Sequence, residues 1–255
     1  MKNIIFMIDV KVEGKEGRTD AYQYSINSWK RWGEKNNAEV MTLTEPLLDP
    51  KEMSLTWQRY YLWDLLENSN VKCDQVLMVD SDTIVHPTCP DFFDMTDKKY
   101  CGVHNEGSYE WLFRSMENYS KYIFGGYTFN FTRYINGGFQ IVNKKHKPFF
   151  NAMIEFYNEH KKTILFLQET YHVGTDQPVL NFLLNMYEID LKILPYEFNG
   201  QSLELVEGLS LLDNGKPLFS EFCFVSHFNA ISNNVESKIS NEWMKITYEY
   251  FYGNM

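Results

Sequence analysis

The first half of the chain alternates short apolar runs with amphipathic segments. The runs at 3–10, 38–43 and 76–79 predict strands, whereas 21–33 and 55–67 carry apolar residues at helical spacing. The third run lacks the polar alternation of a half-exposed strand and is typical of a strand buried on both faces. This order predicts a Rossmann-like α/β fold with a doubly wound, mostly parallel sheet and helices on both faces.

The second half of the chain continues with shorter segments of the same two kinds. They predict strands at 100–103, 134–143, 191–195 and 222–225 and helices at 148–160, 174–185 and 241–251. An aromatic-rich stretch at 104–133 is interpreted as an insertion, and 230–255 as a C-terminal helical segment. Because no repeat, low-complexity segment or linker divides the chain, residues 1–255 are expected to form a single domain.

The composition is that of a chain able to bury a core, since 44% of its 255 residues are hydrophobic. The formal net charge of −10 argues against nucleic-acid binding, which depends on Lys and Arg neutralising phosphates. Four cysteines without a Cys-x-x-Cys pair favour reduced thiols over a zinc site. The sequence shows no signal-peptide pattern and no membrane-spanning run, so we expect a cytoplasmic protein without a membrane span.

Two carboxylates follow the third apolar run, in the segment Asp80-Ser81-Asp82. Side chains alternate along an extended chain, so Asp80 and Asp82 should point the same way. Ligands of open α/β sheets bind at the carboxyl ends of strands, and paired carboxylates suit Mg²⁺ or Mn²⁺. The alternative is a solvated pair of acids, because so short a motif also arises by chance.

Further motifs follow in a fixed order along the chain. They are Met78-Val-Asp80-Ser-Asp82-Thr-Ile, Ile135-Asn136-Gly137-Gly138-Phe139, Asp176-Gln177-Pro-Val-Leu-Asn181, Leu194-Pro195-Tyr-Glu-Phe-Asn199 and Val225-Ser-His227-Phe228. In this order they resemble the GT-A-fold glycosyltransferases, specifically the glycogenin and bacterial galactosyltransferase group (glycosyltransferase family 8-like). The resemblance covers roughly residues 1–230.

The resemblance implies a metal-dependent enzyme that transfers a hexose from a UDP-sugar to a saccharide or other hydroxyl acceptor, with retention of configuration. It implies that His227 joins Asp80 and Asp82 as the third ligand of Mn²⁺ or Mg²⁺. A divalent ion there would stabilise the charge on the departing diphosphate. The alternative for His227 is an ordinary buried histidine with satisfied hydrogen bonds.

The resemblance also assigns residues to the donor sugar. The backbone at Asn136, Gly137 and Gly138 would approach the sugar closely, as the absence of a Cβ permits. Asp176 would bind sugar hydroxyls and Gln177 would lie near the anomeric carbon. The alternatives are a plain bulge at the glycines and a helix cap at Asp176.

Weaker matches assign four more residues to the nucleotide. Thr19-Asp20-Ala21-Tyr22 resembles the family segment Asn-Asp-Ala-Tyr, whose tyrosine stacks on uracil, and this assigns Asp20 and Tyr22. Arg59 matches a basic residue that the family carries on the helix before the strand ending at Asp80. The alternative is that Arg59 is a solvated helix residue. Ser81, between the two aspartates, is assigned to the same site.

The chain departs from the family pattern after His227. After the His-Phe pair the family continues with x-Gly-x-x-Lys-Pro-Trp, whose lysine neutralises the diphosphate, whereas this chain continues with Asn-Ala-Ile-Ser-Asn-Asn and has neither the Gly nor the Lys-Pro-Trp. Lys238 is the next cation, and we expect it to take the place of that lysine.

Three other functions compete with this interpretation. A haloacid-dehalogenase-type phosphatase would carry its Asp-x-Asp on the first strand, with Thr two places after the second Asp, whereas Thr83 follows Asp82 directly. A sugar nucleotidyltransferase would need a basic glycine-rich loop after the first strand, which Gly14-Lys-Glu-Gly-Arg18 matches faintly. A sugar-binding module would leave the candidate metal ligands without a role.

The aromatic-rich stretch is expected to form part of the binding site for the acceptor, because it lies in the sequence between Asp80-Ser81-Asp82 and Asn136-Gly137-Gly138. The aromatic residues that could stack on sugar faces are Tyr109, Trp111, Phe113, Tyr119, Tyr122 and Phe124. The alternative is that these residues belong to the core or to a homodimer contact.

Overall fold

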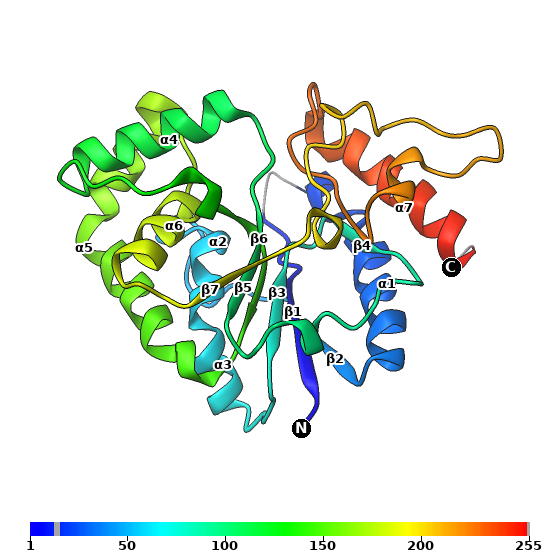
Figure 1. Cartoon of the computed structure of the whole chain (residues 1–255), viewed down its shortest axis with the longest axis horizontal. Coiled ribbons are helices and arrows are strands. Elements are labelled where there is room, and N and C mark those ends of the chain that lie inside the picture. Colours follow the sequence, from blue (N-terminus) through cyan, green and yellow to red (C-terminus); the bar gives the residue numbers. More distant parts are fainter. Residues whose placement is uncertain (13–15, 254–255) are drawn as a thin grey trace.

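The computed structural model describes residues 1–12 and 16–253, and Figure 1 shows a central sheet with helices on either side. The sheet has the strand order β2-β1-β3-β6-β5-β7. The bounds are Asn3–Ile8 (β1), Ala38–Leu43 (β2), Val76–Val79 (β3), Tyr100–His104 (β5), Ile135–Val142 (β6) and Leu191–Leu194 (β7). Neighbouring strands are parallel, except that β6 runs antiparallel to both β3 and β5. The predicted α/β class and mostly parallel sheet are confirmed.

Helices cover both faces of this sheet. They are α1 (Tyr22–Lys35), α2 (Leu55–Gln58), α3 (Leu62–Asn68), α4 (Tyr109–Tyr122), α5 (Lys147–Tyr171), α6 (Asp176–Met186) and α7 (Lys238–Tyr252). In Figure 1, α1 and α7 lie on one side of the sheet, and α4, α5 and α6 on the other. This is the doubly wound arrangement that the sequence predicted.

Alternate side chains of the central strands enter two different cores. Ile4 and Phe6 of β1 belong to the core beneath α3, α5 and α6. Ile5 and Met7 belong to a second core, which contains Trp32 of α1. Burial on both faces removes the need for polar alternation, which explains why the apolar run of β3 was recognisable.

Three element boundaries differ from the prediction. The helix expected at 55–67 is divided by one turn of 3-10 helix at Arg59–Tyr61. The interruption expected at Asn136-Gly137-Gly138 does not end β6, which is buried along its whole length, but the pairing of β6 with β5 shifts register there. The strand expected at 222–225 begins only at Val225, because the preceding residues end a 3-10 turn at Leu218–Glu221.

A two-stranded sheet lies beside the main one and joins distant parts of the chain. It pairs β4 (Thr83–Val85) antiparallel with β8 (Val225–His227), in a register that sets Thr83 opposite His227. A third core, which includes Ile84, Phe228, Met244 and Tyr248, packs this small sheet against α7. The segment directly after Asp82 is thereby held beside His227.

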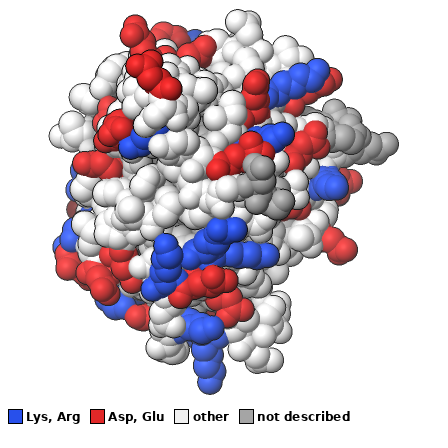
Figure 2. Space-filling model, turned by 90° about the vertical axis from the view of Figure 1, so that its right-hand side faces the viewer, with Lys and Arg blue, Asp and Glu red and all other residues white. Residues whose placement is uncertain are grey.

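The remaining general expectations can be compared with the structure. Residues 13–15, which include part of the glycine-rich loop considered for a nucleotidyltransferase, lie outside the described residues. All four cysteines are free thiols. Among the helices of the described residues, none is both long and apolar enough to cross a membrane. On the face shown in Figure 2, Lys and Arg side chains are interspersed with Asp and Glu.

Candidate active site

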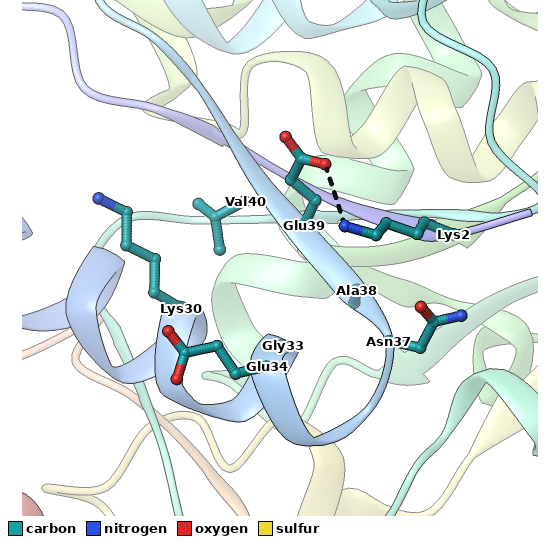
Figure 3. A pocket seen from close by; sticks show the side chains of 8 residues that line it. All are labelled: Lys2, Lys30, Gly33, Glu34, Asn37, Ala38, Glu39 and Val40. Carbon is teal, nitrogen blue, oxygen red and sulfur yellow. Dashed lines mark ion pairs between the residues drawn. The ribbon is translucent and has the colours of Figure 1, made fainter.

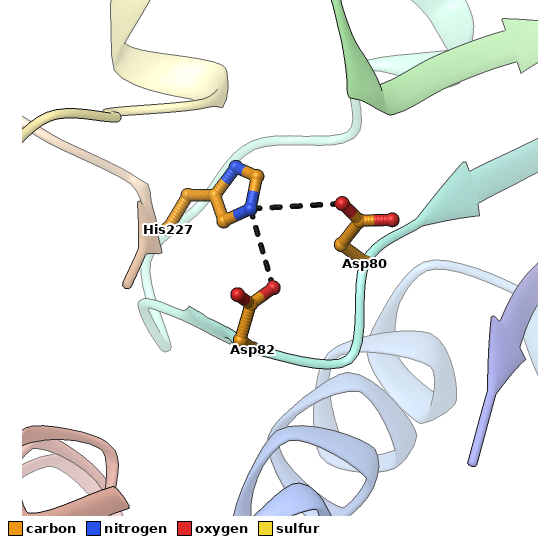
Figure 4. A group of neighbouring side chains, drawn as sticks. All are labelled: Asp80, Asp82 and His227. Carbon is orange, nitrogen blue, oxygen red and sulfur yellow. Dashed lines mark ion pairs between the residues drawn. The ribbon is translucent and has the colours of Figure 1, made fainter. Parts of the chain in front are cut away.

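Asp80, Asp82 and His227 converge at the carboxyl end of β3. His227 Nε2 lies 3.2 Å from Asp82 Oδ1 and 3.8 Å from Asp80 Oδ2, as Figure 4 shows. One ligand atom from each residue lies within 4.8 Å of the other two. The three residues that the resemblance assigned to the metal are thus brought together.

Backbone hydrogen bonds fix the positions of these three residues. Asp80 N donates to the carbonyl of Gly138 at 3.0 Å, which anchors the strand end to β6. Phe228 N donates to the carbonyl of Asp82 at 2.9 Å, next to the pairing of Thr83 with His227. Asp80 is therefore held by the main sheet, and Asp82 and His227 are held by the small one.

The donor set fits a divalent ion. Nε2 of His227 is buried and has no hydrogen-bond partner among the described residues, although two carboxylates face it. A lone pair left in this position, with two hard oxygens beside it, matches the mixed N/O preference of first-row divalent metals. Asp80, Asp82 and His227 could hold such an ion.

The charge state of His227 reflects the same surroundings. Burial lowers the pKa of the imidazole, but the negative charges of Asp82 and Asp80 outweigh burial and raise its pKa above the ordinary value. The raised pKa shows that the two carboxylates make this position favourable for positive charge.

Arg59 connects Asp80, one of the candidate metal ligands, with Asp176. Its guanidinium is buried, donates to Asp80 Oδ1 at 2.8 Å and to the carbonyl of Gly137 at 2.6 Å, and lies 3.9 Å from Asp176 Oδ2. Burial alone would lower the pKa of Arg59, but Asp80 and Asp176 raise it above its ordinary value. Arg59 is therefore not a solvated helix residue, and it leaves Asp80 Oδ2 turned toward His227.

Asp176 does not act as a helix cap. Thr175 takes the N-cap position of α6 without a side-chain capping bond, and Asp176 is the first helical residue. Its buried carboxylate accepts hydrogen bonds from Tyr60 Oη at 3.2 Å and Thr175 Oγ1 at 2.9 Å. The carboxylate faces Arg59 rather than the backbone of its own helix.

The side chain of Gln177 is hydrogen-bonded to Gly137 in β6. Gly137 N donates to Gln177 Oε1 at 2.7 Å, and Gln177 Nε2 donates to Asn105 Oδ1 at 3.1 Å. Asn136 Nδ2 donates to the same oxygen of Asn105, also at 3.1 Å. The pairing of β5 with β6 shifts register at the Asn136 motif, between the Gly102–Gln140 and His104–Ile135 pairs, so the motif is an irregular part of the strand whose backbone amides bind side chains of the site.

A cavity of about 640 Å³ opens beside the metal ligands. Its wall includes Ile8 at the end of β1, Val10 after that strand, Tyr22 of α1, Arg59, and Ser81, whose hydroxyl donates to the carbonyl of Ile8. A second cavity of about 570 Å³ under α7 shares Tyr22 and Asp82 with the first. Tyr22 and Ser81 therefore line the cavity beside Asp80 and Asp82, and their assignment to a nucleotide stays a prediction.

Two assigned residues lie away from this cluster. The Lys238 side chain is 75% exposed and pairs with Glu236 at 3.1 Å, at the start of α7. Asp20 is exposed in the turn before α1. Neither residue is among the described residues that line the two cavities beside Asp82.

A separate cavity of about 350 Å³ lies at the opposite ends of β1 and β2, between Lys2, Glu39 and the end of α1 (Figure 3). Its main charged contact is the ion pair of Lys2 with Glu39 at 3.8 Å, between two largely exposed side chains. Ligands of open α/β sheets bind at the carboxyl ends of the strands, so this position argues against a role in catalysis.

The aromatic-rich stretch divides into buried and exposed parts. Tyr119 and Phe124 are buried, so for these two the core alternative is correct. Tyr109 and Phe113 are exposed and pack with Phe131 at ring-centroid distances of 5.6–6.4 Å. Trp111 is half-buried against Gly174, directly before Thr175.

Sequence reasoning missed two polar residues of the site. Asp9 follows β1 between two cavity-lining residues, and its Oδ1 is buried without a hydrogen-bond partner in the described chain. Asn105 follows β5, is buried, and has an unpartnered Nδ2. Both residues follow predicted strands at their carboxyl ends, and that position was the available signal.

Comparisons with known proteins bear on the fold. No protein-family model and no curated protein matches the chain. A solved structure described as a glycosyltransferase involved in the glycosylation of the major capsid of PBCV-1 is similar, with a TM-score of 0.57 and 14% identity over 96% of this chain and 100% of that one. This similarity shows that the chain has the GT-A-type fold.

Two structures of the glycosyltransferase GlyE from Streptococcus pneumoniae TIGR4, one of them the apo form, also match. Their TM-scores are 0.42 and 0.43, with identities of 15% and 13%. The alignments cover 98% of this chain and 63% of GlyE, so the chain spans less than two thirds of that protein. Membership of the glycogenin and bacterial galactosyltransferase group stays a prediction.

Gly138→Ala should disrupt the three-residue cluster. A Cβ at this position would lie 2.6 Å from both Asp80 Oδ2 and His227 Cε1. Overpacking of this kind costs about 1–3 kcal/mol, so Mn²⁺ affinity should fall by roughly tenfold or more. Electron paramagnetic resonance of free Mn²⁺ during titration measures the affinity.

Gly137→Ala is the matched control, because its Cβ would make ordinary contacts of 3.4 Å or more with Gln177. Circular dichroism verifies that both variants are folded. If folded Gly138→Ala binds Mn²⁺ as tightly as the Gly137→Ala control, the three residues are not the ion site.

Proposed function

We propose that the protein is a metal-dependent glycosyltransferase that transfers a hexosyl group from a UDP-sugar to a saccharide or other hydroxyl acceptor with retention. The observation that carries this proposal is the unpartnered His227 Nε2 facing Asp80 and Asp82 at the mouth of a strand-end cavity. The GT-A-type fold supports the same reaction class.

The nucleotide would occupy the cavity beside β1. Tyr22 offers a ring for stacking on the base, and the unpartnered Oδ1 of Asp9 offers an acceptor for a base N–H. Uracil carries such an N–H together with a flat ring, which favours a UDP-sugar. The assignment of Asp20 and Lys238 to the nucleotide requires their segments to move closer to the cavity.

Asp80, Asp82 and His227 would hold Mn²⁺ or Mg²⁺, and Arg59 would keep Asp80 in place. When bound, the ion supplies Lewis-acid stabilisation for the diphosphate as it leaves. Such a cation would neutralise the diphosphate, because the cationic residues among the described lining of this cavity are Lys51 and Arg59, and Arg59 is already paired with Asp80 and Asp176.

The sugar would lie between Gly137, Asp176 and Gln177. Asp176 would accept hydrogen bonds from sugar hydroxyls, and the Nδ2 of Asn105, which has no partner among the described residues, can donate to a sugar oxygen. The bond from the anomeric carbon to the phosphate oxygen breaks, and a bond to the acceptor oxygen forms. The hydroxyl proton of the acceptor passes to an oxygen of the leaving diphosphate.

The competing functions fit these positions less well. The Asp-x-Asp follows β3, the third strand along the chain, whereas the phosphatase alternative requires the first strand. A nucleotidyltransferase would need a phosphate-binding loop after β1, whereas the acid Asp9 stands there. Free thiols agree with a reducing, cytoplasmic compartment. Homodimer formation stays a prediction.

UDP together with Mn²⁺ should raise the melting temperature, because ligand binding to the native state stabilises it by mass action. At a UDP–Mn²⁺ concentration about 100 times the dissociation constant, the stabilisation is roughly 2.7 kcal/mol. Asp82→Ala should remove the metal-dependent part of the shift, as measured by differential scanning fluorimetry. Asp97→Ala, which alters an exposed ion pair with Lys192, should behave as wild type.

The absence of any shift or calorimetric heat with UDP and Mn²⁺ would show that the donor site is assigned wrongly. A wild-type shift in Asp82→Ala would remove that residue from the site. Mn²⁺ without UDP serves as the reference for each variant.

The exposed cluster of Tyr109, Phe113 and Phe131 would form the acceptor side. His104 packs against Phe131, and the next residue, Asn105, binds Gln177. Phe113→Ala should raise the acceptor KM by roughly threefold to tenfold, as expected for losing one ring contact of about 0.5–1.5 kcal/mol. Donor hydrolysis should be unchanged.

Phe166→Ala is the matched control, because Phe166 is 47% exposed on α5 and Phe113 is 48% exposed on α4. A panel of mono- and disaccharide glycosides supplies the acceptors. If Phe113→Ala changes only the oligomeric state, the cluster is a homodimer contact.

The product should be α-linked when the donor is an α-linked UDP-sugar. Inversion requires a carboxylate free to act as general base, whereas Asp176 is buried and engaged by Tyr60, Thr175 and Arg59. Gln177 cannot act as such a base. Proton NMR of the anomeric coupling in the product decides the stereochemistry, and a β-linked product would make Asp176 the candidate base.

A further inference from the structure

Buried amide side chains form a continuous hydrogen-bonded chain from Gln177 to the imidazole of His227. Its intermediate members are Asn105, Asn136 and Asn199, which are 3%, 4% and 0% exposed. An amide side chain has a donor end and an acceptor end, so each bond in such a chain constrains the next one. The orientation of the amide side chains therefore determines which nitrogen of the His227 ring carries the hydrogen.

Two backbone N–H groups fix the direction of the chain. Gly138 N donates to Asn136 Oδ1 at 2.9 Å, so Asn136 Nδ2 faces Asn105 Oδ1. Gly137 N donates to Gln177 Oε1 at 2.7 Å, so Gln177 Nε2 faces that same Asn105 oxygen. A backbone N–H can only donate, so the N–H groups of Gly137 and Gly138 each fix the orientation of one amide side chain. Both of these amides then present an NH₂ group to Asn105, which must turn its Oδ1 toward them.

The direction continues from Asn136 to His227. Asn199 Nδ2 donates to Asn136 Oδ1 at 3.1 Å, which turns Asn199 Oδ1 toward His227 Nδ1, also at 3.1 Å. A carbonyl oxygen can only accept, so the hydrogen of this bond belongs to Nδ1. The unpartnered Nε2 then carries the lone pair and faces Asp80 and Asp82.

We propose that Asn199 is a positioning residue that holds His227 in the Nδ1–H tautomer, so that Nε2 is always the nitrogen offered to the divalent ion. The ion itself rests on the proposed function, whereas the tautomer is a property of the protein without ligand. Residues that hydrogen-bond the outer nitrogen of a ligating histidine fix its tautomer and ring orientation in the same way. Asn136 accepts a hydrogen bond from Asn199 and so fixes its orientation, which connects β6 with the imidazole of His227.

The test uses the full chain labelled with ¹⁵N-histidine and free of metal. Long-range ¹H–¹⁵N correlation spectra, recorded where the His227 ring is neutral, distinguish the two tautomers, and His227→Gln identifies the signals. Wild type should show the Nδ1–H form. Asn199→Leu should show a mixture of tautomers and bind Mn²⁺ roughly 10–100-fold more weakly.

Two further variants separate positioning from general destabilisation. Asn199→Asp keeps an acceptor oxygen opposite Nδ1 and should retain the Nδ1–H tautomer. Asn181→Leu removes another fully buried amide, which forms hydrogen bonds with the backbone of Ile135 and not with His227. This variant should also retain the Nδ1–H tautomer of His227. An Nε2–H tautomer in wild type, or a pure Nδ1–H tautomer in folded Asn199→Leu, would overturn the proposal. These spectra need no nucleotide, so failure of UDP to bind would refute the proposed function alone.

Discussion

The buried charge of Arg59 is the constraint on which the site depends. A guanidinium removed from water is stable only if its charge and its N–H groups are matched. The partners here are Asp80 at the end of β3, the carbonyl of Gly137 in β6, and Asp176 at the start of α6. Three elements from separate parts of the chain must therefore meet at one point, and the guanidinium of Arg59 holds the candidate metal ligand Asp80 close to Asp176.

Local patterns in the sequence were sufficient for the fold. The apolar run of β3 stood out because both its faces are buried, and the strand–helix order of the first half determined the parallel half of the sheet. The ends of helices and strands were less predictable where tertiary packing overrides the local pattern. The helix expected at 55–67 is one example, because a 3-10 turn begins at the buried Arg59. The two glycines of β6 suggested a break, and the pairing with β5 does shift register there, whereas the exclusion of a Cβ at Gly138 by the close approach of Asp80 and His227 was not readable from the sequence.

The site was predictable only in part. Asp80 and Asp82 follow from a strand end, whereas the position of His227 depends on the pairing of β4 with β8, two strands too short to have a periodic signal. The roles of Asn105 and Asn199 arise from the directions of hydrogen bonds, which no spacing in a sequence encodes. Lys238 was assigned by its order in the chain alone, and its exposed pairing with Glu236 depends on where α7 begins.

The position of the three ligands on two sheets has a mechanical consequence. Asp80 belongs to the main sheet and His227 to the small sheet that packs beneath α7, and a long stretch of chain separates them in sequence. An ion shared between them is a reversible cross-link, and closing a long loop reduces the entropy of the unfolded chain much as a disulfide does. Loading an ion would therefore tighten the small sheet and α7 against the main sheet, and under the proposed function loss of the ion would loosen them again.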